Sequence, residues 1–413
     1  MSWLPIDAQS DFSLHNLPFG IFSGQGRRKT AGVALGDWVI DLKALSKRGV
    51  FDDLGFNTKV FGKPVLNDFM ALGKAVRTGV RARLQAVFGA PRHALAAHRE
   101  EFLVPMDKAT LHLPIKIGDY TDFYSSEEHA TNVGKMFRDP ANALLPNWKH
   151  LPVGYHGRAS SIFVSGVNFH RPKGQTRPND AEPPVFGPCK ALDFELEMAA
   201  VIAQPTRLGQ SLGTAEAEDH IFGFVLFNDW SARDIQKWEY VPLGPFLAKN
   251  FFSSMSPWIV TLEALEPFRT KGYEQVPAVL PYLQYEGQQN FDVTLEVLIQ
   301  PKGAAETRVC RSNFKHLYWT PAQQIAHHTV NGCNLNTGDL LASGTISGPT
   351  PDSFGSMLEL SWSGKNPVPL SDGTERKFIQ DGDTVILRGY AVKGDLRVGF
   401  GEVRNTVLPA LTN

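Results

Sequence analysis

Acidic and large apolar residues alternate in one short segment of the chain, Asp193-Phe194-Glu195-Leu196-Glu197. The alternation predicts a β-strand whose three acids share one face, because successive side chains of a strand point to opposite sides. Like charges buried without partners are costly, so the acids need water or a cation in front of them. A solvated sheet face is one explanation. The apolar run at residues 199–202 favours a packed strand instead, and a hard divalent cation with oxygen ligands would then stabilise the acids.

Residues 119–130 contain three more side chains that could take part in chemistry. Asp122 could be a metal ligand, Tyr124 could donate a hydrogen bond to a substrate, and His129 could be a general base. Histidine suits the last role because its charge changes near neutral pH. Taken alone, each residue is better explained as a solvated or capping residue of a loop. The segment therefore indicates a site only in combination with others.

A fully apolar run at residues 222–227 ends in Asn228-Asp229 and is followed by residues compatible with a helix. If the helix includes the end of the run, one of its faces carries Asp229, Arg233, Gln236 and Tyr240. Such a face offers a carboxylate for a metal, and a guanidinium, an amide and a phenol for an anionic, oxygen-rich ligand. Any two of these residues alone could equally form an ordinary surface pair.

Three isolated features complete the set of candidates. Lys249 lies among apolar residues, where a lysine either extends its ammonium group to solvent or supplies a placed cation. Gly344 and Gly348 permit a tight loop whose backbone N–H groups could hold a carboxylate. Glu359 lies in an apolar run, where an isolated acid needs a partner.

Composition excludes several function classes. The chain has 413 residues and a formal net charge of −1, which gives no electrostatic footprint for nucleic acid or an anionic membrane. No apolar run has membrane-spanning length, and the N-terminus lacks the pattern of a secretory signal. The three cysteines show neither a disulfide framework nor a zinc spacing, which favours a reducing, cytoplasmic location. Motifs of zinc proteases, serine hydrolases and nucleotide-binding loops are missing from the sequence.

The pattern of strands and breakers divides the chain into two units. Residues 1–118 are expected to form a supporting unit, with two strands joined by a tight turn at Gly36-Asp37 and one helix capped by Asn67. Residues 119–413 carry the chemistry. Strands are expected there at 194–203, 222–228, 257–263, 292–299, 307–310, 383–390 and 396–401. Strands dominate over helices, so a mainly β fold of the α+β type, a mixed β-sandwich or roll, is predicted.

Several motifs together resemble one known family. They are Ile117-Gly118-Asp119-Tyr120-Thr121-Asp122-Phe123-Tyr124, His129-Ala130-Thr131-Asn132-Val133-Gly134, Leu144-Leu145-Pro146-Asn147-Trp148, Leu151-Pro152-Val153-Gly154-Tyr155-His156-Gly157-Arg158, the acid-alternating segment, and Gly344-Thr345-Ile346-Ser347-Gly348-Pro349. In this order they are similar to the fumarylacetoacetate hydrolase family. The resemblance covers nearly the whole chain, including the N-terminal unit.

The resemblance implies a small SH3-like barrel at 1–118, a catalytic β-sandwich roll at 119–413, and a homodimer. It implies a divalent metal, Ca²⁺ or Mg²⁺, held by Asp122, Glu195, Glu197 and Asp229. His129 would activate water and Glu359 would orient it. The residues that match oxyanion-stabilising positions are Arg233, Gln236 and Lys249. Those that match substrate-contacting positions are Tyr124, Arg138, Tyr155, Gln236, Tyr240 and Thr345. A second metal would lie near Lys249 and the hydroxyl of Ser253.

Two departures from the family pattern accompany the resemblance. Phe252 stands where the family has glycine, which puts the second metal position in question, and Ser253 follows it. Glu127 and Glu128 precede His129 and should raise its basicity.

The implied activity is hydrolysis of a carbon–carbon bond in a small β-diketo acid, 4-fumarylacetoacetate, to fumarate and acetoacetate, the last step of tyrosine and phenylalanine breakdown. The alternatives are an acylpyruvate hydrolase, decarboxylase or isomerase with the same metal core, or a non-catalytic protein stabilised by Ca²⁺.

Overall fold

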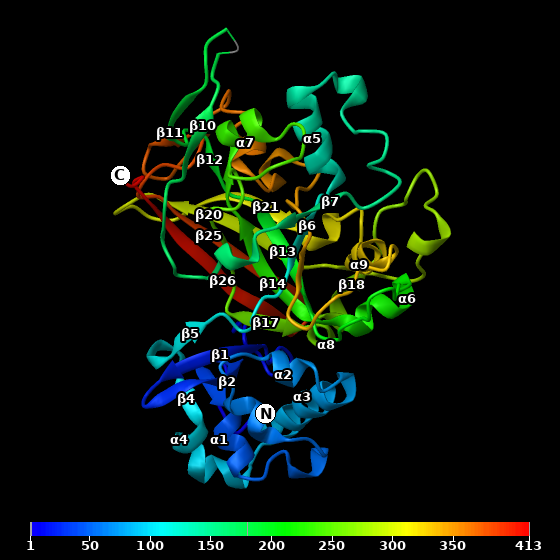
Figure 1. Cartoon of the computed structure of the whole chain (residues 1–413). Helices are drawn as coiled ribbons and strands as arrows, with labels where there is room; N and C mark the ends of the chain where they lie inside the picture. Colours follow the sequence, from blue (N-terminus) through cyan, green and yellow to red (C-terminus); the bar gives the residue numbers. More distant parts are fainter. Residues whose placement is uncertain (1, 180, 413) are drawn as a thin grey trace.

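The computed structural model describes residues 2–179 and 181–412, which form two bodies stacked end to end (Figure 1). The smaller body is built from the first part of the chain, blue to cyan in the figure. Its strands pair in the order β4-β3-β2-β1, with β5 on the other side of β1. Their bounds are β1 Phe19–Gly24, β2 Arg27–Leu35, β3 Trp38–Asp41, β4 Leu103–Pro105 and β5 Thr110–His112. The expected turn between β2 and β3 is present, and Gly36 has a positive φ of 56° there.

Four helices pack against these strands: α1 Leu42–Lys47, α2 Asn67–Met70, α3 Lys74–Gly89 and α4 Arg99–Phe102. The single helix expected after Asn67 is divided at Gly73, whose φ is 96°. Asn67 does not cap it, since the helix has no side-chain cap bond. Instead, the amide of Asn67 donates to the carbonyl oxygens of Lys116 and Thr337 and accepts from the N–H of Lys116. The side chain therefore joins the smaller body to the larger one.

One sheet runs through both bodies. Beyond β1 it continues in the order β17-β14-β13-β22-β6-β7, with β16 and β8 at the side. The bounds are β6 Tyr120–Phe123, β7 Gly154–Gly157, β8 Ile162–Val164, β13 Leu196–Ile202, β14 Ile221–Asp229, β16 Ser253–Met255, β17 Trp258–Thr261 and β22 Leu340–Ala342. Strands β13 and β14 are buried along their whole length, as expected for central strands.

A second sheet covers one face of the first and has the order β21-β20-β25-β26-β9. Its bounds are β9 Phe169–His170, β20 Thr294–Gln300, β21 Thr307–Asn313, β25 Thr384–Lys393 and β26 Leu396–Leu408. Leu226, Leu295 and Phe400 lie in the shared apolar core. This arrangement confirms the prediction of a mainly β fold with mixed sheets, and the N-terminal unit is a small β domain. The boundary at 118 stays a prediction.

Short elements complete the larger body. Two-stranded pairs are β10 Lys173–Thr176 with β11 Val185–Pro188, β12 Leu192–Asp193 with β15 Ser231–Ala232, β18 Arg269–Thr270 with β19 Asn290–Phe291, and β23 Val368–Pro369 with β24 Glu375–Arg376. The helices are α5 Glu127–Phe137, α6 Thr214–Ala217, α7 Arg233–Glu239, α8 Leu262–Leu265, α9 Pro321–Thr329 and α10 Met357–Leu360.

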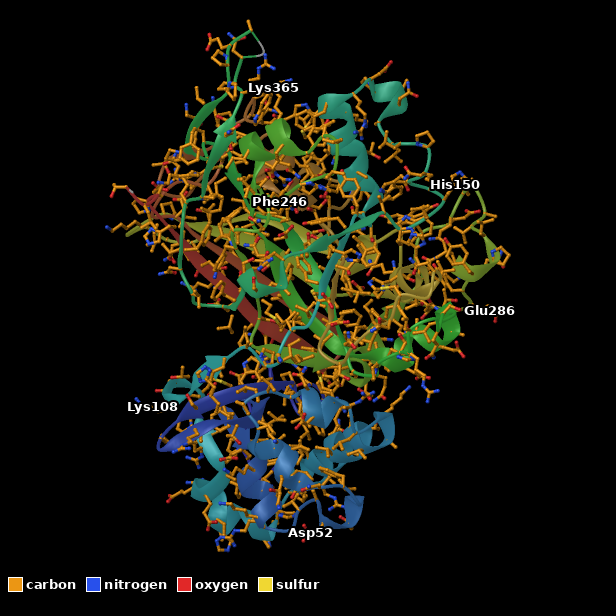
Figure 2. All side chains as sticks on the ribbon, viewed as in Figure 1. Asp52, Lys108, His150, Phe246, Glu286 and Lys365 are labelled. Carbon is orange, nitrogen blue, oxygen red and sulfur yellow. The ribbon has the colours of Figure 1, made fainter. Side chains whose placement is uncertain are left out.

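Side chains fill both bodies (Figure 2), where Asp52 and Lys108 mark the smaller one and Phe246 and Lys365 the larger. Most of the expected strands are present. The strand expected at 257–263 ends early because α8 begins at Leu262. The strand expected at 194–203 begins at Leu196 and is separated from β12 by two residues. Among the described residues, no helix combines the length and the apolar character needed to cross a membrane.

Candidate active site

Four buried carboxylates converge in the larger body. Asp122 lies on β6, Glu197 on β13, Asp229 at the end of β14, and Glu195 just before β13. Each offers an oxygen, and these oxygens all lie within 4.8 Å of one another. The family resemblance implied this set of residues, whereas the residue pattern placed Asp229 on a helix. The strand β14 presents Asp229 instead, because α7 begins only at Arg233.

Backbone and phenol groups of the protein meet only part of the hydrogen-bonding capacity of this carboxylate group. The N–H of Gly344 donates to Asp122 Oδ1 at 3.1 Å and to Glu197 Oε2 at 3.2 Å. A side chain could not replace this glycine, because its Cβ would lie 2.2 Å from the carbonyl oxygen of Phe123. Tyr120 OH donates to Asp122 Oδ2 at 2.9 Å. Oxygen Oε1 of Glu197 is buried and has no hydrogen-bond partner among the described residues. An unpartnered buried carboxylate oxygen is a ligand position for a cation.

Two cations of the protein partly compensate the four acids. Lys249 forms ion pairs with Glu195 and Asp229, and Arg233 lies 2.7 Å from Glu195. Burial would raise the pKa of Glu195, but the charges of Lys249 and Arg233 outweigh it and hold this pKa well below its usual range. Because Arg233 also pairs with Asp193, five carboxylates share these two cations, which leaves a formal charge of −3 when all are ionised. The group therefore fits one divalent cation.

Asp122 and Glu197 are farther from this compensation. Burial, together with the nearby carboxylate of Asp229, raises the pKa of Asp122. Burial, together with Asp122, raises the pKa of Glu197. These two acids are thus destabilised as carboxylates until another positive charge reaches them.

A histidine–glutamate pair lies beside the carboxylate group. Nδ1 of His129, on α5, lies 2.6 Å from Oε2 of Glu359, on α10, and both residues are buried. The carboxylate of Glu359 also accepts hydrogen bonds from Asn132 at 3.0 Å, from Ser347 at 2.9 Å and from Ser356 at 2.8 Å. Burial would raise the pKa of Glu359, but His129 and the hydrogen bonds from Asn132 and Ser356 together lower it.

An ionised Glu359 only accepts hydrogen bonds, so Nδ1 of His129 carries a proton and donates it. The other ring nitrogen, Nε2, is then left to accept a proton from elsewhere. The ring of Tyr124 contacts that of His129 edge-on, with centroids 5.2 Å apart. The pair thus has the geometry of an oriented general base.

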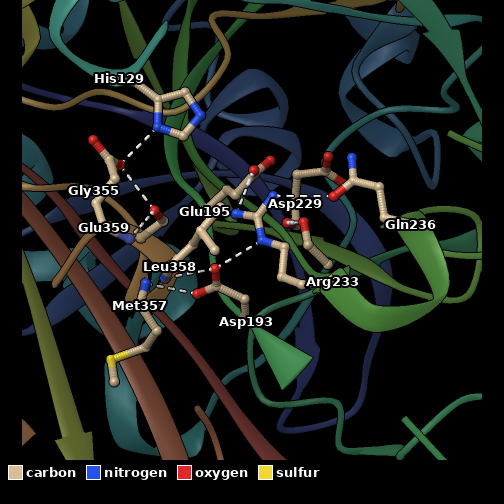
Figure 3. A network of polar contacts seen from close by, with 12 residues as sticks. His129, Asp193, Glu195, Asp229, Arg233, Gln236, Gly355, Met357, Leu358 and Glu359 are labelled. Atoms are coloured by element: carbon tan, nitrogen blue, oxygen red, sulfur yellow. Dashed lines mark hydrogen bonds and ion pairs between the residues drawn. The ribbon is translucent and has the colours of Figure 1, made fainter. Parts of the chain in front are cut away.

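Arg233 lies between two acids (Figure 3). Its Nε donates to Asp193 Oδ2 at 2.8 Å, and its Nη1 donates to Gln236 Oε1 at 3.3 Å. Its Nη2 is close to Glu195 but has no aligned hydrogen bond, although the atom is buried. This nitrogen therefore keeps N–H groups that a ligand could use.

Family models cover almost the entire chain. The model described as fumarylacetoacetate (FAA) hydrolase C-terminal matches residues 119–408, and the one described as fumarylacetoacetase N-terminal matches residues 15–114. The chain belongs to the fumarylacetoacetate hydrolase family. Curated relatives named fumarylacetoacetase include a Bos taurus protein that is 53% identical over 100% of both chains. An Arabidopsis thaliana relative with this name is 48% identical and covers 99% of this chain and 98% of its own.

Solved structures agree with the fold of this family. A structure described as fumarylacetoacetate hydrolase from psychrophilic Exiguobacterium antarcticum aligns with a TM-score of 0.53 at 18% identity, covering 95% of this chain and 99% of its own. At this identity the match supports the fold alone.

The substrate-contacting positions carried over from the family are not all brought together. Tyr155 OH donates to Asp229 Oδ2 at 3.1 Å, so this residue lies at the carboxylate group. Thr345 follows Gly344, and no group in the described part of the chain forms a hydrogen bond with its buried hydroxyl. Arg138, by contrast, is exposed and donates to the carbonyl oxygen of Ala143. Tyr240 follows α7 and is 53% exposed.

The two departures from the family pattern are accommodated locally. Phe252 points into the core, stacked on Phe169 with ring centroids 4.4 Å apart. Ser253 Oγ donates to Asp229 Oδ1 at 3.0 Å, so the hydroxyl still reaches the site. Glu127 forms an ion pair with Lys149 at 2.6 Å.

Glu128 accepts a hydrogen bond from Tyr273 at 2.6 Å. Both extra acids near His129 thus have partners of their own, and the expected rise in basicity of His129 stays a prediction.

Sequence reasoning missed the residues that hold the catalytic candidates in place. Asn132, Ser347 and Ser356 surround Glu359, and their residue types and spacing gave no sign of it. Asp193 stood in the alternating segment but received no separate role. Its contact with Arg233 could not be foreseen, because it joins two elements that are 40 residues apart.

Proposed function

We propose that the protein hydrolyses the carbon–carbon bond of 4-fumarylacetoacetate to fumarate and acetoacetate, the final step of tyrosine and phenylalanine breakdown. The observation that carries this proposal is the oriented His129–Glu359 pair beside a buried group of four carboxylates. The full-length relatives named fumarylacetoacetase support the choice of substrate.

His129 is the general base in this proposal. Nε2 takes a proton from a water molecule, whose oxygen attacks the substrate carbonyl next to the bond that breaks. Glu359 keeps the proton on Nδ1 and stabilises the charged ring that forms. The carbon–carbon bond then breaks, its electrons go to the acetoacetate carbon, and that carbon takes up a proton. The attacked carbonyl becomes the new carboxylate of fumarate.

Three side chains would stabilise the negative charge that develops on the attacked carbonyl oxygen. Arg233 Nη2 has no aligned hydrogen bond to the described residues although it pairs with Glu195, Gln236 has an amide next to it, and Lys249 adds a positive charge. Donors held in place before the reaction are effective because they need no reorganisation, and the loss of one typically costs about 10²–10³ in rate.

Asp122, Glu195, Glu197 and Asp229 would hold a divalent cation, Ca²⁺ or Mg²⁺. Such an ion, when bound, supplies positive charge for the carbonyl oxygens of a β-diketone. The hydroxyl of Ser253 contacts Asp229 and could be a ligand of a second ion, whereas the positive charge of Lys249 on the same carboxylate opposes one there. Tyr124, Arg138, Tyr155, Tyr240 and Thr345 would contact the substrate.

The assembly proposed is a homodimer in the cytoplasm. Large apolar side chains are exposed after α7, among them Val241 at 67%, Leu243 at 97% and Phe246 at 67%. Surfaces of this kind commonly pack against another chain. Three free cysteines fit a reducing compartment. Light scattering of the purified protein would measure the number of chains per particle.

The activity is tested by following the loss of ultraviolet absorbance of fumarylacetoacetate, with fumarate and acetoacetate identified as products. Wild-type protein with Mg²⁺ or Ca²⁺ should consume the substrate, and His129→Gln should lose at least ~10²-fold in kcat. His98→Gln, which alters a half-exposed histidine of the N-terminal unit, is the matched control and should keep full activity. Faster turnover of fumarylpyruvate or oxaloacetate would contradict the proposed substrate. If the protein consumed none of these substrates with any metal ion, the proposal that it is an enzyme would be contradicted.

A further inference from the structure

Asp193 is the one acid of the alternating segment that lies outside the carboxylate group. It is completely buried, and every partner it has is a hydrogen-bond donor. Its Oδ2 accepts from Arg233 Nε at 2.8 Å and from the backbone N–H of Leu358 at 3.0 Å. Its Oδ1 accepts from the backbone N–H of Met357 at 2.7 Å. Figure 3 shows all of these contacts.

These contacts determine which edge of the Arg233 guanidinium faces the site. Because Asp193 binds Nε, the two Nη groups point away from it, toward Glu195 and Gln236. A guanidinium is planar and rigid, so fixing one edge fixes the other. Nη2, which has no aligned hydrogen bond, is thereby held at the carboxylate group.

The anchor of Asp193 is the start of α10. Met357 and Leu358 donate to it, and the next residue along the chain is Glu359, the partner of His129. The segment before α10 is tied to the same place, since the N–H of Leu196 donates to the carbonyl oxygen of Gly355 at 2.9 Å. The helix that carries Glu359, and so orients His129, therefore also fixes the position of Arg233 through Asp193.

We propose that Asp193 is a positioning residue that fixes Arg233 against the start of α10, so that the oxyanion donor and the His129–Glu359 base keep one relative geometry. The inference rests on the proposed function for its kinetic consequence. It adds to that function a residue that never touches the substrate.

The alternative is that Asp193 only stabilises the fold, and the chain offers a matched control for it. Asp383 is also a buried aspartate that binds an arginine, with Oδ2 2.7 Å from Arg376 Nε and Oδ1 2.8 Å from Arg376 Nη2. It also accepts a backbone N–H, from Gln380. None of the described contacts of this pair involves the candidate active site.

The test compares Asp193→Asn with Asp383→Asn. Both changes place an amide N–H₂ against donors, and both should lower the midpoint of urea unfolding to a similar extent. Asp193→Asn should lower kcat by about 10²-fold with less than ~3-fold change in KM, which is the size of a lost oxyanion donor. Asp383→Asn should keep the wild-type kcat. Equal kcat values for the two variants would overturn the proposal. If Asp193→Asn does not fold, Asp193→Ser, which keeps one acceptor, takes its place.

A double-mutant cycle identifies the route of the effect. If Asp193 acts through Arg233, the double variant Asp193→Asn/Arg233→Lys should be within ~3-fold of Arg233→Lys alone in kcat. If the loss of kcat in the double variant were the product of the losses in the two single variants, Asp193 would act independently of Arg233, and the proposal would be overturned.

A readout without turnover separates this proposal from the proposed function. Phenylglyoxal modifies arginine, and mass spectrometry reports the rate at Arg233. Release of Nε in Asp193→Asn should raise this rate by about tenfold, a change that corresponds to about 1.4 kcal/mol, and Asp383→Asn should leave it unchanged. An unchanged rate in Asp193→Asn overturns the positioning role, whereas a raised rate in a protein that hydrolyses no diketone would leave it standing and refute only the proposed activity.

Discussion

Glu197 and Glu359 are two glutamates at the same site, with exposed fractions of 0% and 1%, yet the protein treats them in opposite ways. Glu359 has hydrogen-bond donors at both oxygens, and its pKa is lowered although burial opposes this. One oxygen of Glu197 has no hydrogen bond to any described residue, and burial together with Asp122 raises the pKa of Glu197. Groups of the protein therefore satisfy the hydrogen-bonding capacity and the charge of the Glu359 carboxylate, whereas the carboxylate of Glu197 needs a cation. The different pKa shifts of the two glutamates follow from the groups that surround each carboxylate.

The largest effect should come from Glu197→Gln. Activity should fall by about 10³-fold or more, because a ligand of the cation is lost and metal ions contribute several kcal/mol to such reactions. The metal-free variant should nevertheless unfold at the same or a higher urea concentration than the metal-free wild type, because an uncompensated buried acid has been removed. Steady-state kinetics and urea unfolding measure the two effects. If the Glu197→Gln variant were active and less stable than the metal-free wild type, Glu197 and Glu359 would not differ in the way described here.

The converse change, Glu359→Gln, should cost stability. His129 loses its charged acceptor, and an amide N–H₂ faces groups that now donate to a carboxylate. We expect a loss of about 2 kcal/mol in the free energy of unfolding and about 10²-fold in kcat, with metal affinity retained. Urea unfolding and calorimetric titration with Mg²⁺ would check this. Retained stability would show that the network around Glu359 is not what keeps it ionised.

The two acids should also respond oppositely to pH. A raised pKa, as for Asp122 and Glu197, contributes stability below the ordinary pKa of the acid that is lost as pH rises through the raised value. The lowered pKa of Glu359 contributes stability above its usual value of 4.5 that is lost as pH falls through the lowered value.

Cation binding requires ionised ligands, so it should release protons, and affinity should rise with pH through the raised pKa values of Asp122 and Glu197. Calorimetry in two buffers of different ionisation enthalpy measures the released protons. Binding without proton release would contradict the raised pKa of Glu197.

The smallest effect should come from Asn132→Ala, which removes one of the hydrogen bonds to Glu359. We expect a loss of about 1 kcal/mol in the free energy of unfolding and less than ~10-fold in kcat, since Ser347, Ser356 and His129 remain. Asn366→Ala, at an exposed asparagine after α10 with no side-chain hydrogen bond to the described residues, is a suitable control and should change neither quantity. If Asn132→Ala were as damaging as Glu359→Gln, the network would depend on one bond rather than on several.

The family resemblance gave Asp122, Glu195, Glu197 and Asp229 as one set, and the structure brings these four carboxylates together, while their role as metal ligands stays a prediction. Local patterns gave only part of the set and of its geometry. The alternation around Glu195 and Glu197 is a property of neighbouring residues, so it could be recognised without the fold. Asp229 was assigned to a helix because nothing in the sequence shows that the chain leaves β14 before α7 starts. Asn67 was expected to be a cap, but its partners Lys116 and Thr337 are distant in sequence.

The supporting contacts could not be predicted for the same reason. Ser347 and Ser356 reach Glu359 from a loop and a helix cap, and a serine gives no indication of which acid it will bind. The family resemblance supplied Arg138 and Tyr240 by position alone, and both lie exposed in the structure. Side-chain partners across the sheet are set by packing, which short motifs do not encode.

The central claim is that Asp122, Glu195, Glu197 and Asp229 hold one divalent cation. Calorimetric titration of the metal-free protein with Mg²⁺ and with Ca²⁺ tests it most directly, with Glu197→Gln and Glu359→Gln titrated alongside. We expect a site in wild type that is lost or weakened by at least ~10²-fold in Glu197→Gln and retained in Glu359→Gln. Equal affinity in wild type and Glu197→Gln, or no binding of either ion to wild type, would contradict the account.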